Sequence, residues 1–243
     1  MAGRASTFAI DRLEVTVAGD SREAGRLAAA DVAGSLRSLT AVRESVRVVF
    51  AAAPSQSVML AALVRAPGID WMRVRAYQMD EYLGLPSDAP QRFGNWLRRN
   101  LFDHVPLTFH PLDTEGGYLD PAPVDLVCLG IGENGHLAFN DPPVARFDDE
   151  QDLRVVDLDL SSRMQQVHDG LFPAIGDVPT RALTLTIPRL MRSARIVGVA
   201  CGPNKAVALQ RTVAGPVDPS CPATALRLHE NVTLYTDLAA YGG

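Results

Sequence analysis

The chain has 243 residues, 47% of them hydrophobic and 21% charged, and a formal net charge of −5. This composition is ordinary for a globular protein, and the acidic balance argues against a nucleic-acid partner, although a local basic cluster can still bind a small anion. No apolar run approaches the length of a membrane span and the N-terminus has no apolar signal core, so we expect a cytoplasmic protein without a membrane partner. The three cysteines are far apart in the sequence, and Cys128 and Cys201 lie in apolar runs, which favours buried thiols over disulfides or a metal site.

The N-terminal part of the chain alternates strand and helix patterns. Residues 13–17 alternate apolar and polar side chains, which predicts a short strand at a sheet edge. Asp20 and Glu23 have the spacing of a capping box, and apolar residues then recur with helical spacing over 27–39. The apolar run 46–50 predicts a second strand.

The next segments repeat this alternation. Residues 51–57 lead from the second strand into a helix, and a strand at 72–79 ends in two acidic residues before a loop that Pro86 closes. A helix with apolar residues on one face follows at 91–101. The other expected elements are a brief strand at 108–112, a linker at 113–123 with too much Gly and Pro for a helix, and a buried strand at 125–131.

The C-terminal half begins with a polar, loop-like segment at 147–178 that holds a strand at 153–158. Further strands are expected at 182–187, 195–200 and 232–236, a helix from 202 to about 215, and a short helix at 222–228. Because strands and helices alternate along most of the length, we expect one α/β domain over residues 1–243. Its sheet should be doubly wound and mostly parallel, with helices on both faces in a Rossmann-like arrangement.

The stretch 125–143 carries the densest pattern of candidate site residues. Its strand runs into a glycine-rich turn at 130–135, which lets the backbone turn sharply and approach a ligand closely. His136 follows, five residues before Asp141, so the pair has the composition of a general base and its orienting carboxylate at the end of a strand. The alternative is a glycine turn with a surface histidine.

Two segments are similar to the signature loops of a known family. Residues 79–86 (MDEYLGLP) and 130–142 (GIGENGHLAFNDP) resemble those of the glucosamine-6-phosphate deaminases, also called isomerases. The related 6-phosphogluconolactonases usually carry Asp-Glu-Arg and Gly-His-Thr-Ala-Ser there, whereas Tyr82 and the run 135–140 lie on the deaminase side. The similarity extends, with gaps, from about residue 20 to residue 237, through 178–187, 202–209 and 223–229.

This resemblance implies a reaction and a general base. Deaminases of the family open the sugar ring, move a proton between C2 and C1 and release ammonia, leaving a ketose phosphate, and they need no metal or other cofactor. By the resemblance, Asp80 is the carboxylate that moves the proton. An isolated Asp has a pKa of about 3.9, so burial beside Glu81 would raise its basicity. The alternative for both acids is a solvated loop pair.

The resemblance assigns ring opening to His136, since a histidine with an ordinary pKa of about 6.5 suits proton transfer to and from sugar oxygens. Two flanking side chains depart from the family pattern. Asp141 is shortened from the usual glutamate, and Asn134 replaces an aspartate that many members have. Asn134 can orient an imidazole but cannot stabilise an imidazolium by charge. The loops that hold the substrate would include Glu81, Tyr82 and Gly135.

The phosphate loop is where the chain departs most from the family. The family sequence is typically Thr-Gly-Gly/Ser-Thr-Pro, with backbone N–H groups that hold the phosphate at a helix N-terminus. Residues 53–57 stand in its place, and Pro54 among them has no N–H group. Ser55 and Gln56 can still donate to a phosphate. An alternative role for Ser55 is a helix N-cap.

Three cationic or titratable residues are candidates for the phosphate. Lys205, the only lysine in the chain, matches the phosphate lysine of the family and lies in the first turn of its helix. His168 falls where the family has a phosphate-binding arginine. Arg163, one turn earlier if this segment is helical, also aligns with a family arginine and is a candidate for part of that role.

We therefore expect a deaminating aldose–ketose isomerase that converts an amino-sugar 6-phosphate, with glucosamine 6-phosphate as the first candidate, to fructose 6-phosphate and ammonia. One alternative is a catalytically weak sugar-phosphate-binding regulator, which the altered phosphate loop and Asn134 favour. The other is a 6-phosphogluconolactonase. The expected partner is a small sugar phosphate; a homo-oligomer is compatible with the sequence, which does not determine the oligomeric state or the sugar epimer.

Overall fold

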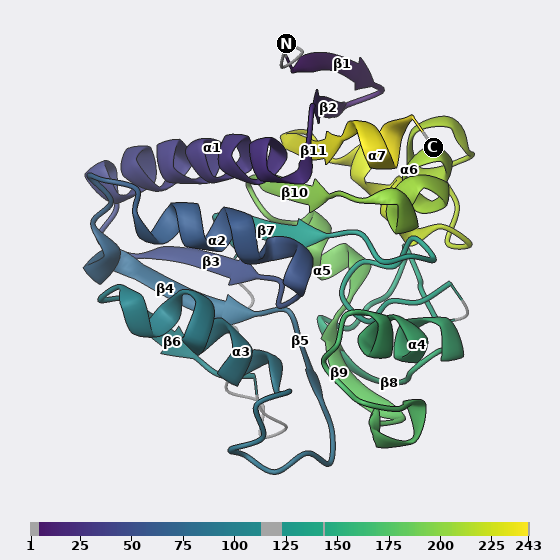
Figure 1. Cartoon of the computed structure of the whole chain (residues 1–243). Helices are drawn as coiled ribbons and strands as arrows, with labels where there is room; N and C mark the ends of the chain where they lie inside the picture. The colour runs from purple at the N-terminus through teal and green to yellow at the C-terminus, as the bar shows by residue number, and fades with distance from the viewer. Residues whose placement is uncertain (1–4, 113–122, 143, 243) are drawn as a thin grey trace.

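The computed structural model describes residues 5–112, 123–142 and 144–242, which two sheets organise (Figure 1). The larger sheet has eight strands in the order β1-β2-β11-β10-β7-β3-β4-β6. Its neighbouring strands are all parallel except β1 and β2, which pair antiparallel at one edge. The strands are β1 (Ser6–Ile10), β2 (Leu13–Ala18), β3 (Val46–Phe50), β4 (Val74–Gln78), β6 (Thr108–His110), β7 (Leu126–Gly130), β10 (Ile196–Ala200) and β11 (Val232–Asp237).

Helices cover both faces of this sheet. Along β3, Val48 and Phe50 face the core that contains α1, α2 and α3, whereas Val49 faces the core that contains α5 and α6, because successive side chains of a strand point to opposite faces. The predicted doubly wound, mostly parallel α/β fold is therefore confirmed. The α-helices are α1 (Ser21–Val42), α2 (Ser57–Val64), α3 (Phe93–Asn100), α4 (Leu160–His168), α5 (Ile187–Met191), α6 (Ala206–Ala214) and α7 (Leu238–Tyr241). The 3-10 turns are η1 (Pro54–Gln56), η2 (Trp71–Arg73), η3 (Phe102–His104), η4 (Ile175–Asp177), η5 (Pro203–Lys205) and η6 (Pro222–Leu228).

The start of α1 follows from its capping residues. Asp20 accepts a hydrogen bond from the backbone N–H of Glu23 at 2.7 Å, as the sequence predicts. The Glu23 carboxylate reaches back to the N–H of Gly19 at 2.8 Å, one residue before the position expected for a capping box. Both contacts satisfy N–H groups at the beginning of the helix, so α1 starts where the sequence predicts.

A second, three-stranded antiparallel sheet corrects the expectation of a single sheet. It consists of β5 (Asp80–Tyr82), β9 (Arg181–Leu185) and β8 (Leu153–Asp157), in that order. The acidic pair at 80–81 is therefore a strand and not a loop, because β9 supplies a hydrogen-bonding partner along it. A strand of three residues is too short for periodicity to indicate. At the edge of the larger sheet, β1 covers β2, which was expected to be the edge strand.

Helix α4 is a further correction, since residues 147–178 were expected to be loop-like apart from one strand. The helix begins at the N-cap Asp159, which accepts from the N–H of Ser161 at 3.2 Å. Its buried residues are Ser162, Gln165 and Gln166. They recur at i, i+3 and i+4, as a helix requires, but they are polar, so an apolar pattern does not indicate them.

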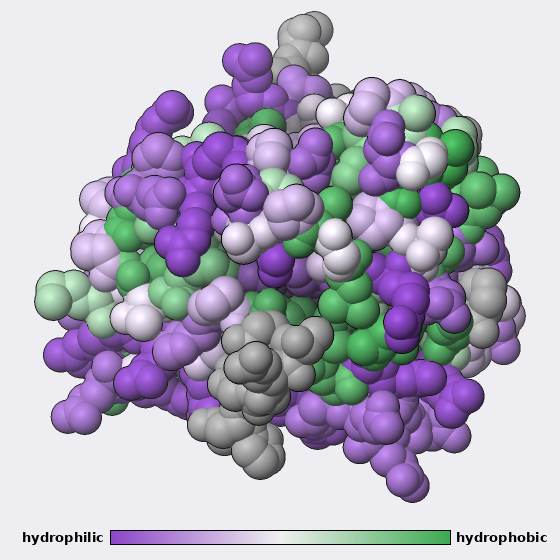
Figure 2. Space-filling view, turned by 90° about the horizontal axis from the view of Figure 1, so that it is seen from below, coloured by the Kyte–Doolittle hydropathy of each residue, from purple (hydrophilic) through white to green (hydrophobic). Residues whose placement is uncertain are grey.

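Two further expectations concern the predicted linker and membrane-spanning helices. Residues 113–122, most of the predicted linker, lie outside the described residues. Within the described part of the chain, no helix is long and apolar enough to cross a membrane. Viewed from below, hydrophobic patches alternate with hydrophilic ones over the surface (Figure 2).

Candidate active site

A cavity opens at the carboxyl ends of β3, β4, β7 and β10, where doubly wound folds place their ligands. It brings together side chains that are far apart in the sequence. They lie on β5, on α4 and in the segments that follow β3, β7 and β10. A separate, larger hollow at the amino ends of β10 and β11 contains none of the predicted site residues. The polar residues that line the first cavity are Ser55, Asp80, His136, Gln165, Gln166, Asp169 and Lys205.

Asp80 lies on β5, where its backbone pairs with Thr184 of β9. Its side chain lines the cavity, although the residue is only 6% exposed. Burial, and secondly the neighbouring Glu81, raise the pKa of Asp80 well above the ordinary carboxylate value. The alternative of a solvated loop pair is wrong, because Glu81 is also buried. Asp80 thus has the position and the raised basicity of a general base.

Glu81 and Tyr82 were predicted to hold the substrate, but neither lines the cavity. The Glu81 carboxylate accepts hydrogen bonds from the N–H groups of Phe93 at 3.0 Å and Gly94 at 3.1 Å, so it caps the first turn of α3. Tyr82 packs in an aromatic cluster beneath the cavity wall. The contacts of Glu81 and Tyr82 therefore stabilise the fold around Asp80. The cluster consists of Tyr82, Phe93, Phe139 and Phe172.

His136 lies in the glycine-rich turn after β7, with its imidazole against Gly132. A Cβ at Gly132 would lie between 2.2 and 2.4 Å from ring atoms, so this close approach needs glycine. The ring Nδ1 lies 2.9 Å from Asn134 Oδ1 and 3.0 Å from Asp141 Oδ1. Both oxygens can only accept, so Nδ1 carries a proton and Nε2 is left as the proton acceptor at the cavity. At 8% exposure, His136 is not the surface histidine of the alternative interpretation.

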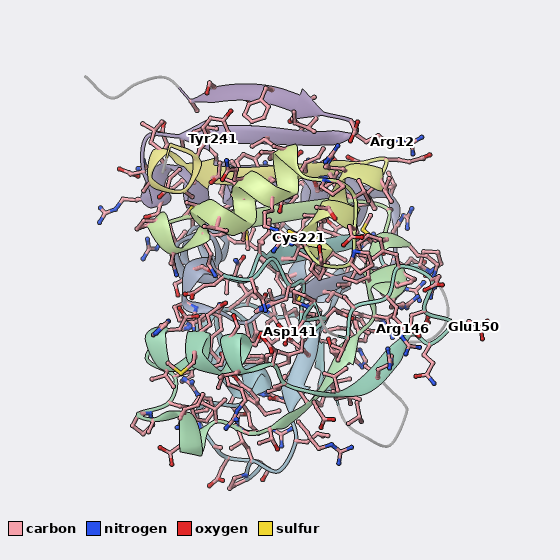
Figure 3. The ribbon with its side chains drawn as sticks, turned by 90° about the vertical axis from the view of Figure 1, so that its right-hand side faces the viewer. Arg12, Asp141, Arg146, Glu150, Cys221 and Tyr241 are labelled. Carbon is pink, nitrogen blue, oxygen red and sulfur yellow. The ribbon has the colours of Figure 1, made fainter. Side chains whose placement is uncertain are left out.

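Asp141 lies in the interior of the molecule, and its side chain belongs to the same network (Figure 3). Burial raises the pKa of Asp141, but hydrogen bonds with His136, Asn134 and Ser162 outweigh it and lower the pKa to about 2. The Asn134 amide donates to Asp141 at 2.9 Å and accepts from the N–H of His136 at 3.0 Å. Asp141 therefore stays ionised beside the imidazole and supplies the negative charge that Asn134 lacks.

Gly135 shapes this turn through its backbone and does not line the cavity. Its φ of +90° lies in the left-handed region, and a Cβ would lie 2.6 Å from the sulfur of Cys221. The residues that end this loop, Phe139 and Asn140, are hydrogen-bonded to β9. Phe139 donates its N–H to Thr184 Oγ1 at 3.1 Å, and the Asn140 amide donates to the carbonyl of Leu185 at 2.8 Å. The small sheet thus holds the histidine loop as well as Asp80.

Lys205 ends η5 immediately before α6, and its side chain lines the cavity. The residue is 4% exposed, and burial lowers its pKa, while the carboxylates of Asp169 and Glu133 act in the opposite direction. Among the described residues, Nζ has no hydrogen-bond or ion-pair partner. Asp169 lines the same cavity, and burial is the main cause that raises its pKa. The lysine can therefore take an anion, but a carboxylate stands beside the place where the anion would lie.

The loop at 53–57 differs from the expected phosphate loop. Ser55 lines the cavity, but the structure assigns no N-capping hydrogen bond to its side chain. Gln56 does not line the cavity: it is fully buried, its Nε2 donates to the carbonyl of Val199 at 3.3 Å, and its N–H donates to Ala53 at 2.9 Å. Its donors are thus engaged by the protein itself, and Gln56 supports the loop from behind the cavity wall.

Arg163 and His168 also lie outside the cavity lining. The Arg163 guanidinium donates to the carbonyls of Ile175 at 2.7 Å and Val178 at 3.0 Å, so it holds the segment after α4. The His168 side chain is 56% exposed and lies 3.7 Å from a Glu133 carboxylate oxygen. Neither residue is placed to take over the role of a phosphate-binding arginine in this conformation.

Sequence reasoning missed the contribution of α4. Gln165, Gln166 and Asp169 line the cavity, and Ser162 contacts both His136 and Asp141. The sequence holds a possible N-cap, Asp159, followed by polar residues at helical spacing, but it does not show that this polar stripe is buried, which is what marks it as part of a polar site. Among the described residues, no group of three His, Cys, Asp or Glu side chains is arranged to hold a metal ion.

The fold and the cavity define a doubly wound α/β protein with a carboxylate, an imidazole and a lysine at the carboxyl ends of its strands. A family described as glucosamine-6-phosphate isomerases/6-phosphogluconolactonase matches residues 19–235. Glucosamine-6-phosphate deaminases of Bacillus cytotoxicus and Bacillus thuringiensis are 36% identical over 191 residues, which are 74% of this chain and 71% of each relative. The chain therefore belongs to the glucosamine-6-phosphate isomerase/6-phosphogluconolactonase family.

Solved structures agree with this assignment. A monomeric glucosamine-6-phosphate deaminase is similar with a TM-score of 0.84 and 25% identity, over 94% of this chain and 98% of that chain. The 6-phosphogluconolactonase of Trypanosoma brucei is similar with a TM-score of 0.76 and 16% identity, over 96% of this chain and 99% of that chain. The second likeness concerns the fold alone.

Proposed function

We propose that this protein is a deaminating aldose–ketose isomerase that converts glucosamine 6-phosphate and water to fructose 6-phosphate and ammonia. The observation that carries the proposal is a buried carboxylate with a raised pKa, Asp80, in one cavity with an imidazole whose Nε2 is left to accept a proton. The test is ammonia release from a panel of 6-phosphorylated amino sugars, with lactone hydrolysis measured alongside. We expect ammonia release, and lactone hydrolysis without it would contradict the proposal.

His136 opens the sugar ring in this mechanism. Its Nε2 removes the proton of the anomeric hydroxyl and delivers a proton to the ring oxygen as the bond from C1 to that oxygen breaks. The imidazole is a cation between these two steps, and the ionised Asp141 at 3.0 Å from Nδ1 stabilises that charge. A neutral histidine with its proton on Nδ1 is the starting form that these steps require.

Asp80 acts on the open-chain sugar. Its carboxylate takes the proton from C2, next to the carbonyl, and delivers it to C1. The carbonyl oxygen gains the proton that the amino group gives up, so C1 becomes a hydroxymethyl group and C2 carries an imine. Water adds to this imine and ammonia leaves, so the product is the ketose phosphate. Because only the ionised carboxylate accepts a proton, the raised pKa of Asp80 makes kcat/KM fall on the acid side at a pH above the ordinary carboxylate range.

Replacement of His136 by Gln tests the division of labour between the two groups. We expect the variant to lose about 10²-fold or more in turnover of the cyclic sugar and much less in turnover of an open-chain analogue, because ring opening alone needs the imidazole. The matched control is His104→Gln, which changes an exposed histidine on η3. Equal losses on the cyclic and open-chain substrates would assign His136 a structural role.

Replacement of Asp169 by Asn tests the charge beside Lys205. The Asp169 carboxylate opposes a dianionic phosphate in the same cavity, so we expect the neutral variant to lower KM for the sugar phosphate, roughly three- to tenfold at neutral pH. Asp177→Asn, at an exposed position of η4, is the control for the change in net charge. A higher KM in Asp169→Asn would mean that this carboxylate binds the substrate instead of opposing it.

A sugar-phosphate-binding regulator is the second candidate function. The observation that favours it is the arrangement around the anion site, where Asp169 lies beside Lys205 and the donors of Gln56 are engaged by the protein. Calorimetric binding of sugar phosphates, measured together with ammonia release, separates the two functions. Tight binding without ammonia release at any pH would favour the regulator.

A further inference from the structure

One buried hydroxyl links the two halves of the proposed acid–base pair. Ser162 lies on α4 and is 1% exposed. Its Oγ lies 2.5 Å from Asp141 Oδ1 and 2.8 Å from His136 Nδ1. A carboxylate can only accept, so the hydroxyl donates its proton to Asp141 and its lone pair is left to accept the N–H of the imidazole.

The path through this hydroxyl is built from closer contacts than the direct one. Nδ1 and Asp141 Oδ1 are 3.0 Å apart, whereas each link through Ser162 is shorter. Hydrogen bonds that end on an ionised group are the stronger ones, and a chain of them polarises each member. Two side chains bridge Nδ1 to Asp141. The amide of Asn134 does so with 2.9 Å at each link, and the hydroxyl of Ser162 gives the shorter path, because one oxygen accepts from the ring at 2.8 Å and donates to the carboxylate at 2.5 Å.

We propose that Ser162 is a positioning residue for His136: together with Asn134 and Asp141 it holds the proton on Nδ1, and its shorter contacts fix the orientation in which Nε2 is the proton acceptor at the cavity. The role rests on the proposed function of His136 in ring opening. Ser162 does not line the cavity and so acts through the histidine. Because it lies on α4, it also ties the orientation of the imidazole to the helix that carries Gln165, Gln166 and Asp169.

The kinetic test compares hydroxyl and non-hydroxyl side chains at this position. Ser162→Ala is expected to lose about tenfold more activity on the cyclic sugar than on an open-chain analogue, since a hydrogen bond in a charged network is lost. Ser162→Thr, which keeps the hydroxyl, should restore the ratio of the two activities, and Ser162→Cys, which keeps the volume, should not. The control is Ser161→Ala, the exposed neighbour on the same helix, which should match the wild type.

A spectroscopic test does not depend on turnover. The chain has five histidines, so the imidazole signals of a 15N-histidine-labelled sample are few, and His136→Gln assigns the one of interest. The wild type and Ser162→Thr should show a protonated, slowly exchanging Nδ1 at His136. Ser162→Ala and Ser162→Cys should show faster exchange of that proton, because the shortest hydrogen bond to Nδ1 is lost. An unchanged exchange rate and activity ratio in the Ala and Cys variants would overturn the role of Ser162. Absence of ammonia release by the wild type would instead overturn the proposed function, while the imidazole signals still decide the role of Ser162.

Discussion

Replacement of Asp80 by Asn is expected to reduce exchange of the C2 proton with solvent by about 10²- to 10⁴-fold, the range that a positioned general base contributes. Asn has nearly the same shape as Asp but cannot accept the proton, so substrate binding should change little. Deuterium incorporation into the sugar in heavy water measures the exchange, and calorimetry measures binding. Near-normal exchange in the variant would remove Asp80 from the mechanism.

The same variant has an expected effect on stability, with a sign that follows from the raised pKa. A carboxyl group with a folded-state pKa above its unfolded value destabilises the fold once the pH rises above the unfolded value, because the folded state resists ionisation. Asp80→Asn should therefore unfold at a higher temperature than the wild type at neutral pH, and this advantage should disappear below the ordinary carboxylate pKa of about 3.9. Asp157→Asn, at an exposed position of β8 in the same small sheet, is the control and should show neither effect.

Replacement of Lys205 by Ala or Met is expected to raise KM for a phosphorylated amino sugar by roughly ten- to a hundredfold. The phosphate is a dianion, and a charge-assisted contact contributes on the order of 1.5–3 kcal/mol. Lys205 is buried, and Nζ has no partner among the described residues, so a bound anion would supply that partner. Steady-state kinetics with phosphorylated and unphosphorylated amino sugars measures the effect, which should be confined to the phosphorylated ones.

Two further variants separate this role from a structural one. Lys205→Arg should recover part of the affinity, because the planar guanidinium does not occupy the same point as the ammonium. Arg211→Ala removes a cation from an exposed position of α6 and should leave KM unchanged. The Lys205 variants should be as stable as the wild type or more so, since they remove a buried cation. Unaltered binding of the sugar phosphate by Lys205→Ala would place the phosphate elsewhere in the cavity.

The sequence was sufficient for the doubly wound architecture and for the position of the cavity. Apolar runs such as 46–50 and 125–131 predict buried parallel strands, because such strands are covered on both faces and do not alternate. Glycine-rich and polar residues after these strands predict a site at their carboxyl ends, since parallel strands end at the same edge. This pattern pointed to His136 and to the acidic pair at 80–81, and the resemblance to the deaminase family gave Asp80 and Lys205 their expected roles. The structure places Asp80, His136 and Lys205 in one cavity.

Only the tertiary structure decided which polar residue serves the cavity and which serves the fold. Glu81 and Arg163 have the residue types of a substrate site, yet their partners are the N–H groups of α3 and the carbonyls that follow α4. A side chain's type limits the hydrogen bonds it can make, but the partner is set by contacts between segments distant in sequence. For the same reason Asp169 beside Lys205, and Ser162 between His136 and Asp141, could not be predicted: α4 buries a polar face, so apolar periodicity did not indicate the helix that carries them.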